Sequence, residues 1–250
     1  MKILITGASS GIGLEMAKYL AKDKHELILV SRSKEKLEQI QETLPTKVTI
    51  IVADLANEQK VKELYAVVKK LDIDVLINNA GFGVFGYLTE TDINKEMEMI
   101  DTNIKAVHIL TKLIVKDMEK KNSGYILNVA SSAAFQPGPL MAAYYATKSY
   151  VFQLTAALYY EQKVKKSKVG ISVLCPGPVD TNFNNVAGVR FGVKSLSADY
   201  VAKYAIDNMF KKKMLIIPGK TMKLAKFFGR FISEKRMLKT TYKIQKKKVD

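Results

Sequence analysis

This sequence of 250 residues has few of the residue types that build disulfides and metal sites. It contains one cysteine, Cys175, no tryptophan and two histidines, His25 and His108. A single thiol excludes a disulfide within the chain and is typical of a reducing cytoplasm, where we expect the protein to reside. With so few sulfur and imidazole ligands, a zinc site is not expected, and we predict no metal.

Long apolar runs are also missing. Gly7 and Gly11 interrupt the N-terminal apolar stretch, which is therefore too short for a secretory signal peptide. No run approaches the ~18 apolar residues that span a bilayer. Hydrophobic residues still make up 48% of the sequence, enough for a sizeable core. We expect one large domain, residues 1–219, followed by a C-terminal extension, residues 220–250.

Acidic residues are scarce mainly near the C-terminus. The net charge is +16, and residues 211–250 contain 14 Lys and Arg against 2 Asp and Glu, a net charge of +12. The first 210 residues therefore carry only +4, which is ordinary for an enzyme. Because the basic residues belong to the tail and form no recognised nucleic-acid motif, we predict no nucleic-acid partner.

Short β-branched runs alternate with segments of helical periodicity. Two helical faces are expected, one from Val61, Leu64, Val67 and Leu71, the other from Met97, Ile100, Ile104, Val107 and Ile114. Alternating strands and helices favour an α/β, doubly wound Rossmann fold, with a single parallel sheet of about seven strands and helices on both faces. The expected strands are residues 2–6, 26–31, 47–53, 73–78, 124–130, 169–175 and 214–217.

A glycine-rich turn follows the first expected strand and opens a helix. Its residues are Thr6, Gly7, Ala8, Ser9, Ser10, Gly11, Ile12 and Gly13. Glycines allow the backbone to approach a pyrophosphate, and the helix N-terminus supplies free N–H groups with a favourable dipole. A plain strand–helix turn is the alternative interpretation, but the position directly after the first strand favours dinucleotide binding.

The end of the second expected strand indicates which dinucleotide binds. Ser31, Arg32 and Ser33 stand there, with no carboxylate to hold a ribose 2′-hydroxyl. Arginine pairs with a 2′-phosphate, and either serine can assist. The alternative is a solvated arginine, although a helix start does not favour a cation. We predict NADP(H) as the cofactor.

Tyr144 and Lys148 lie four positions apart in a helical segment, so they share one face. A tyrosine with a pKa near ~10 is a poor acid or base at neutral pH, and a nearby ammonium favours its phenolate. The pair alone is common by chance. Tyr145 is a rival three positions from Lys148.

Taken together, these motifs resemble the short-chain dehydrogenase/reductase family over residues 1–217. The resemblance rests on the glycine-rich turn and on further motifs in order: Asp54-Leu55, Asn78-Asn79-Ala80-Gly81, Asn103, Asn128 to Ser131, Tyr144 with Lys148, and Pro176-Gly177. It implies an oxidoreductase that transfers a hydride between NADPH and a small-molecule carbonyl or alcohol substrate. It also implies a homo-oligomer through helices around residues 92–121 and 141–165.

The resemblance assigns a role to each matching residue. Tyr144 would donate the proton, Ser131 would bind the substrate carbonyl, with Ser132 the weaker candidate, and Lys148 would bind the nicotinamide ribose and tune Tyr144. Asn103 would hold a water that connects Lys148 to solvent. The remaining residues would contact the cofactor: Asp54 and Leu55 near the adenine, Asn79, Ala80 and Gly81 along the adenosine, and Pro176, Gly177, Val179 and Thr181 at the nicotinamide.

The substrate is less well indicated. In this family the loop at residues 181–197 covers the substrate, and here it holds Phe183, Val186, Val189 and Phe191. This composition suits an apolar ketone or aldehyde. Alternatives are a 3-oxoacyl thioester reductase of lipid synthesis and a catalytically silent, NADPH-sensing regulatory protein, although relatives of the silent kind commonly lack the tyrosine or lysine present here.

The C-terminal extension begins with an amphipathic basic segment. Its apolar stripe is Leu224, Phe227, Phe228, Phe231 and Ile232, and its lysines lie largely elsewhere around the helix. One interpretation is that the stripe packs on the protein's own cleft or on a second subunit. The other is peripheral membrane contact through residues 220–240, because basic helices with an aromatic apolar face bind anionic membrane surfaces.

Overall fold

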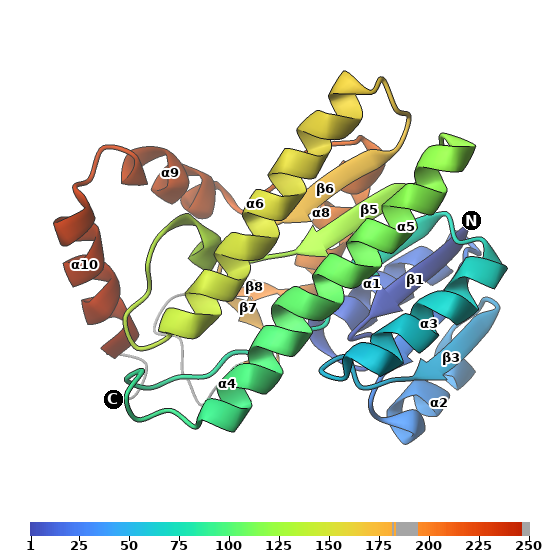
Figure 1. Cartoon of the computed structure of the whole chain (residues 1–250), viewed down its shortest axis with the longest axis horizontal. Coiled ribbons are helices and arrows are strands. Elements are labelled where there is room, and N and C mark those ends of the chain that lie inside the picture. Colours follow the sequence, from blue (N-terminus) through green and yellow to red (C-terminus); the bar gives the residue numbers. More distant parts are fainter. Residues whose placement is uncertain (182, 184–194, 247–250) are drawn as a thin grey trace.

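The computed structural model describes residues 1–181, 183 and 195–246, and its centre is a parallel sheet of seven strands (Figure 1). The strand order is β3-β2-β1-β4-β5-β6-β9. The expected doubly wound fold is therefore confirmed, with two strands at the expected bounds and the other five shorter than expected by a few residues at most. The strands are β1 (Lys2–Thr6), β2 (Glu26–Ser31), β3 (Val48–Val52), β4 (Val75–Asn78), β5 (Tyr125–Val129), β6 (Gly170–Leu174) and β9 (Leu215–Ile216); β7 (Val179–Asp180) and β8 (Leu196–Ser197) pair separately.

Helices cover both faces of this sheet because successive strand residues point to opposite sides. In β1, Ile3 and Ile5 pack into one core with α1, α2 and α8, whereas Leu4 packs into the other with α3 and α5. Strands buried on both faces are near-continuous apolar runs, as β1 and β2 are between their polar terminal residues. The helices are α1 (Gly11–Ala21), α2 (Lys34–Thr43), α3 (Glu58–Leu71), α4 (Ile93–Ile100), α5 (Val107–Lys121), α6 (Ala142–Val164), α8 (Ala198–Phe210), α9 (Lys220–Gly229) and α10 (Glu234–Lys246).

The two expected helical faces are only partly correct. In α3, Val61 and Leu64 are buried as expected. Val67 is exposed, and its neighbour Val68 is buried in its stead. In α4, Met97 is exposed and Met99 is buried instead. The cause lies after α4, where residues Asp101–Ala106 form a π-helix that continues into α5. A wider turn changes the residue spacing, so a period of 3.6 cannot be carried across it.

The strand order reverses beside β1, whose neighbours are β2 on one side and β4 on the other. Crossovers therefore leave β1 and β4 toward opposite faces, and a crevice opens at the carboxyl ends of these strands. Ligands of open α/β sheets bind at such a switch point. The fold thus brings the glycine-rich turn after β1 to the same edge as the segment that follows β4.

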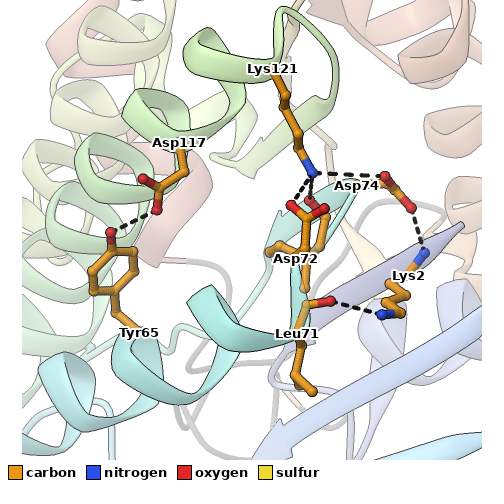
Figure 2. A network of polar contacts seen from close by, with 8 residues as sticks. Lys2, Tyr65, Leu71, Asp72, Asp74, Asp117 and Lys121 are labelled. Atoms are coloured by element: carbon orange, nitrogen blue, oxygen red, sulfur yellow. Dashed lines mark hydrogen bonds and ion pairs between the residues drawn. The ribbon is translucent and has the colours of Figure 1, made fainter.

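The opposite edge of the sheet is held by a polar network (Figure 2). Lys121, the last residue of α5, donates to Asp72 Oδ1 at 2.5 Å and to the carbonyl of Ile73 at 3.0 Å. The Asp74 carboxylate accepts from the backbone N–H of Lys2 at 2.8 Å. The network therefore joins the ends of α3 and α5 to the starts of β1 and β4.

The helices α9 and α10 stand to one side of the sheet, beyond α6 (Figure 1). Met222 and Lys226 of α9 are half-buried, and the Lys226 ammonium lies 5.0 Å from the ring centre of Phe135. Gln136, in the loop before α6, donates a hydrogen bond from its Nε2 to Thr241 Oγ1 of α10 at 2.9 Å. In the part of the chain that the structure describes, no helix is long and apolar enough to cross a membrane.

Candidate active site

A cleft of about 1630 Å³ runs along the carboxyl edge of the sheet. Most of the residues predicted to bind cofactor or substrate line it: Gly7, Ser9, Ser10, Gly11, Ile12, Arg32, Asp54, Leu55, Asn79, Ala80, Gly81, Ser131, Tyr144, Pro176, Gly177, Val179 and Thr181. Asn103, Lys148 and Gly13 do not line it directly and lie behind its wall. Sequence positions from 7 to 181 thus converge on one edge of the sheet.

The glycine-rich turn is held closed by Asn79. Its side-chain amide donates to the carbonyls of Thr6 and Gly7 at 3.0 and 3.1 Å, and its backbone N–H donates to Thr6 Oγ1 at 3.0 Å. A Cβ on Gly13 would collide with the Asn79 amide and with the Gly7 carbonyl, so only glycine fits there. Asn79 therefore supports the turn as well as lining the cleft.

This turn fits a dinucleotide. Gly7 has a φ of +64°, which lets the backbone bend sharply into α1. Ser10 precedes α1, and its side chain makes no capping hydrogen bond. The N–H groups of the first helical turn therefore remain available to an anion such as a pyrophosphate.

The end of the cleft beside β2 contains a cation, Arg32, that is already paired with a carboxylate. Arg32 donates to Glu98 Oε1 of α4 at 2.7 Å, and both side chains line the cleft. Both are substantially exposed, and exposed ion pairs contribute only ~0–1 kcal/mol. Lys36, which sequence reasoning did not single out, lines the same end.

Tyr144 and Lys148 come together on the first turns of α6. The Lys148 Nζ lies 5.9 Å from the centre of the Tyr144 ring and donates to the carbonyl of Val129 at 3.0 Å. Burial raises the pKa of Tyr144 above its ordinary value, an effect that a hydrogen bond with Ser131 opposes. Burial lowers the pKa of Lys148 to about 8. The tyrosine therefore holds its proton at neutral pH, as an acid must.

Asn103 is placed by the π-helix. Its side chain accepts from the N–H of Phe82 at 3.1 Å and donates to the Phe82 carbonyl at 2.9 Å and to Thr147 Oγ1 at 3.1 Å. A Cβ on Gly81 would stand 2.7 Å from Asn103 Oδ1 and 3.3 Å from Lys148 Nζ. Gly81 thus separates the cleft from both groups, and π-helical turns recur at functional sites.

Tyr145, the rival of Tyr144, has a different partner. Its hydroxyl accepts a hydrogen bond from Gln245 of α10, and its ring packs against Gly138. The Tyr144 ring instead contacts Phe183 at 5.4 Å between centres. Of the two tyrosines, only Tyr144 combines proximity to Ser131 with proximity to Lys148.

Sequence reasoning missed two parts of the site. One is a buried network in which Asn78 donates to Asn128 Oδ1 at 2.8 Å and Asn128 donates to Thr155 Oγ1 at 2.9 Å, which ties β4 and β5 to α6. The other is the extent to which the C-terminal extension lines the cleft. Its lining residues, from α9, α10 and the segment between them, are Met222, Ala225, Lys226, Phe228, Gly229, Arg230, Ile232, Met237, Thr240, Thr241, Ile244 and Gln245. Only the apolar stripe gave a signal for the second.

Two other expectations concern residues near the cleft. Cys175, which the sequence predicts to pack as a small apolar side chain, is buried. The expected substrate loop falls mostly on residues 184–194, outside the described residues, and Phe183 is the one aromatic of that loop that the structure places. Within the described ranges, no group of three or more His, Cys, Asp or Glu side chains is arranged to hold a metal ion.

Comparison with known proteins agrees with this geometry. The family model described as short chain dehydrogenase matches residues 1–188. An uncharacterized oxidoreductase of Staphylococcus epidermidis is 32% identical over 202 residues, which are 80% of this chain and 86% of that protein.

Two further proteins are informative. A very-long-chain 3-oxoacyl-CoA reductase of Anas platyrhynchos is 36% identical over 172 residues, which are 65% of this chain and 55% of the reductase. Among solved structures, a short-chain dehydrogenase from Sphingobium yanoikuyae in complex with NADPH has a TM-score of 0.83 and 25% identity. The match covers 92% of this chain and 93% of that one.

Proposed function

Because this chain belongs to the short-chain dehydrogenase family, we propose that it transfers a hydride between NADPH and an apolar ketone or aldehyde. The observation that carries the proposal is that Tyr144 and Ser131 line the cleft together, with Lys148 and Asn103 close behind Gly81. The family membership makes it an oxidoreductase. The cofactor preference, the substrate and the residue roles are the proposal.

The choice of NADPH is supported by charge. Bound at the glycine-rich turn, the cofactor supplies the hydride. Arg32 and Lys36 line the far end of the cleft, and the related dehydrogenase from Sphingobium yanoikuyae was solved with NADPH. A 2′-phosphate offers Arg32 a stronger, bidentate partner than the exposed Glu98 carboxylate. The phosphate therefore displaces Glu98 in the proposed complex.

In the proposed carbonyl reduction, each residue of the site has a distinct role. The Ser131 hydroxyl donates a hydrogen bond to the substrate oxygen, and the Tyr144 hydroxyl transfers its proton to the same oxygen as negative charge develops there. The Lys148 ammonium stabilises the phenolate left on Tyr144. Asn103 fixes the segment of Phe82 beside Lys148, where a water would pass protons back from solvent.

The apolar substrate is supported by the lining of the cleft. The lining includes Phe82, Val84, Phe85, Met141 and Phe152, together with Met222, Phe228 and Ile232 of the C-terminal extension. Few charged groups stand among them, so a sugar or other polyol would lose hydrogen bonds with water on binding. A ketone or aldehyde with an extended apolar part fits this wall.

A substrate panel tests the proposal. Oxidation of NADPH, and separately of NADH, is followed with ketones, aldehydes and 3-oxoacyl thioesters of increasing chain length. We expect turnover of apolar ketones or aldehydes with NADPH preferred. A preference for NADH would contradict the cofactor assignment. Turnover of thioesters alone would support the second candidate, which the similarity to the Anas platyrhynchos reductase favours.

Two variants test the cationic end. Replacing Arg32 by alanine removes a charge-assisted contact of ~1.5–3 kcal/mol, so we expect the KM for NADPH to rise about tenfold or more while the KM for NADH stays unchanged. Glu98→Gln removes a carboxylate that competes with the phosphate and lowers the KM for NADPH. Equal effects on both cofactors would contradict a phosphate contact. Binding of NADPH without any turnover would favour the NADPH-sensing alternative.

We also propose a homo-oligomer. Large apolar side chains are exposed on the helices that the family resemblance assigned to subunit contact, namely Ile93 and Met97 of α4 and Tyr160 and Val164 of α6. Light scattering of the purified protein measures the mass, and a monomer of 28.0 kDa would refute this proposal.

A further inference from the structure

The C-terminal extension carries an exposed apolar surface that continues beyond the two of its residues, Phe228 and Ile232, that line the cleft. It consists of Leu224, Phe227, Phe228, Phe231 and Ile232, hereafter the α9 apolar surface, whose side chains are 46–75% exposed. The Phe227 ring lies 5.3 Å from Phe228 and 5.7 Å from Phe231 between centres, so the three form one aromatic cluster. Contiguous apolar surfaces of this kind mark interaction sites.

The same helix has an inner side that is occupied. Met222 packs against Gly177, where a Cβ would approach its Cγ to 2.7 Å, and Lys226 lies over the rings of Phe135 and Phe152. The position of α9 is therefore fixed by its inner contacts, and its aromatic cluster is turned outward. Among the residues that the structure describes, no buried core cluster includes any member of the α9 apolar surface.

The charge around this surface has one sign. Helix α9 contains no acidic residue, and residues 211–250 carry a net charge of +12. Lys220 of α9, Arg230 directly after it, and Lys235, Arg236 and Lys239 of α10 are exposed. An apolar aromatic face surrounded by lysine and arginine is complementary to an anionic lipid surface, in which the rings enter the acyl boundary and the cations meet the headgroups.

The cleft reaches this surface. Phe228 and Ile232 belong to the α9 apolar surface and also line the cleft, as does the half-exposed Ile244 of α10. A molecule dissolved in the acyl layer would therefore meet the apolar wall of the cleft without crossing water. Phe227 and Phe231 do not line the cleft, so they can be changed without altering the wall.

We infer that the α9 apolar surface docks on an anionic lipid bilayer and that the cleft takes its carbonyl substrate from that bilayer. Docking is independent of the proposed reaction, whereas the substrate route rests on it. The charge favours a bilayer over a second copy of this chain, because two copies would bring two strongly basic extensions together.

Vesicle sedimentation of the full-length protein tests docking. Vesicles of phosphatidylcholine alone are compared with vesicles of equal parts phosphatidylcholine and phosphatidylglycerol. We expect binding to the anionic vesicles that weakens as salt is added, and a loss of at least about tenfold in Phe227→Ser/Phe231→Ser, since each phenylalanine buried contributes well over a factor of ten. The control Val52→Ser/Val67→Ser changes residues of 50% and 47% exposure on β3 and α3, two elements on the other side of the molecule from α9 (Figure 1), and should bind normally.

The remaining outcomes overturn the inference. Equal vesicle binding by both double variants would show that the α9 apolar surface does not dock. If the unaltered protein does not bind vesicles and Phe227→Ser/Phe231→Ser lowers the mass measured by light scattering, a second copy covers the surface instead.

Kinetics test the substrate route separately. With a long-chain ketone supplied in anionic vesicles, KM should be lower for the unaltered protein than for Phe227→Ser/Phe231→Ser, while turnover of a short water-soluble ketone stays equal. Equal KM values in vesicles would refute the route. Vesicle binding with no carbonyl turnover at all would refute the proposed function and leave docking standing.

Discussion

Lys148, the buried lysine of the candidate site, is expected to lower the stability of the folded protein. Lys148 is 5% exposed and its ammonium has one hydrogen-bond acceptor, the carbonyl of Val129. Removing this cation from water costs free energy, which is why its pKa falls to about 8. In the proposed reaction, the phenolate left on Tyr144 would supply the negative charge that this cation stabilises.

This cost predicts a stabilised but inactive variant. Below pH 8 both the folded and unfolded states hold the Lys148 proton, and the folded state bears the full cost. Between pH 8 and the unfolded pKa near ~10.4 only the folded state releases it, so stability rises with pH in this window. Lys148→Met removes a cost of about 3 kcal/mol and a hydrogen bond of ~1 kcal/mol, so we expect it to be more stable by about 2 kcal/mol at pH 7.

Urea denaturation at pH 7 and pH 10 measures this difference. The advantage of Lys148→Met should shrink at pH 10, where the folded protein no longer holds the proton. Lys116→Met replaces an exposed lysine of α5 and should leave stability nearly unchanged at both values. A destabilised Lys148→Met at pH 7 would mean that the ammonium is solvated in the folded protein.

The proton donor is tested at the neighbouring position. Tyr144→Phe removes the hydroxyl but keeps the ring that packs against Phe183, so NADPH should bind as before while kcat falls ~10²–10⁴-fold. Tyr145→Phe is the matched control, because its hydroxyl contacts Gln245 of α10 rather than the centre of the site. Steady-state rates and cofactor fluorescence separate the two effects. Loss of kcat only in Tyr145→Phe would reverse the assignment.

For single residues, the sequence predicted those contacts that depend only on spacing along the chain. Tyr144 and Lys148 are one helical turn apart, and Gly7, Gly11 and Gly13 lie in one turn, so their proximity follows from local geometry. The ion pair of Arg32 with Glu98 joins residues 66 positions apart. Nothing in the neighbourhood of either residue indicates the other, and only the folded chain reveals the competition for Arg32.

Elements were predicted best where one pattern governs a whole segment. The seven strands of the sheet were expected within a few residues because each is a short, mainly apolar run, and β1, β2, β4, β5 and β6 are buried on both faces. The π-helix at Asp101–Ala106 was not, since one wide turn leaves no mark in a short apolar pattern. This wide turn also explains why Asn103 faces Thr147 and Phe82 although Met97 does not share its buried side.

The contacts of Lys121, at the C-terminal end of α5, make a contribution to stability that can be measured. Lys121 bonds both Asp72 and the Ile73 carbonyl and lies 3.9 Å from Asp74 (Figure 2). Lys121→Met should lower the free energy of unfolding by about 1–2 kcal/mol, because it breaks a charge-assisted hydrogen bond to a partly buried carbonyl. Thermal denaturation measures the change.

Lys120→Met is the matched control for that variant. Lys120 is the neighbouring lysine at the same helix end, but it is 68% exposed and its ammonium lies 3.6 Å from Asp117 Oδ1. An exposed pair of this kind contributes ~0–1 kcal/mol. Equal losses in the two variants would show that the C-terminal charge of α5, rather than the bonds to Asp72 and Ile73, is what stabilises this edge.

On the scale of the whole molecule, the sheet domain and the C-terminal extension contribute different residues to the cleft and the core. The predicted cofactor contacts all lie before residue 182, and the described core clusters take only Met222 from beyond Gly219. The extension instead supplies one wall of the cleft. We therefore predict that the boundary near Gly219 separates the residues that hold the cofactor from those that enclose the substrate.

A chain ending at Gly219 tests this division. We expect it to fold cooperatively with NADPH affinity unchanged, because it keeps all seven strands of the sheet and the glycine-rich turn. The KM for a long-chain ketone should rise about tenfold or more, since each CH₂ that loses its buried wall at Phe228, Ile232 or Ile244 gives up ~0.8 kcal/mol. A short ketone, which does not reach that wall, is the internal control. Loss of the cooperative unfolding transition would show instead that α9 and α10 belong to the folding unit of the sheet, with Met222 against Gly177 as its closest link.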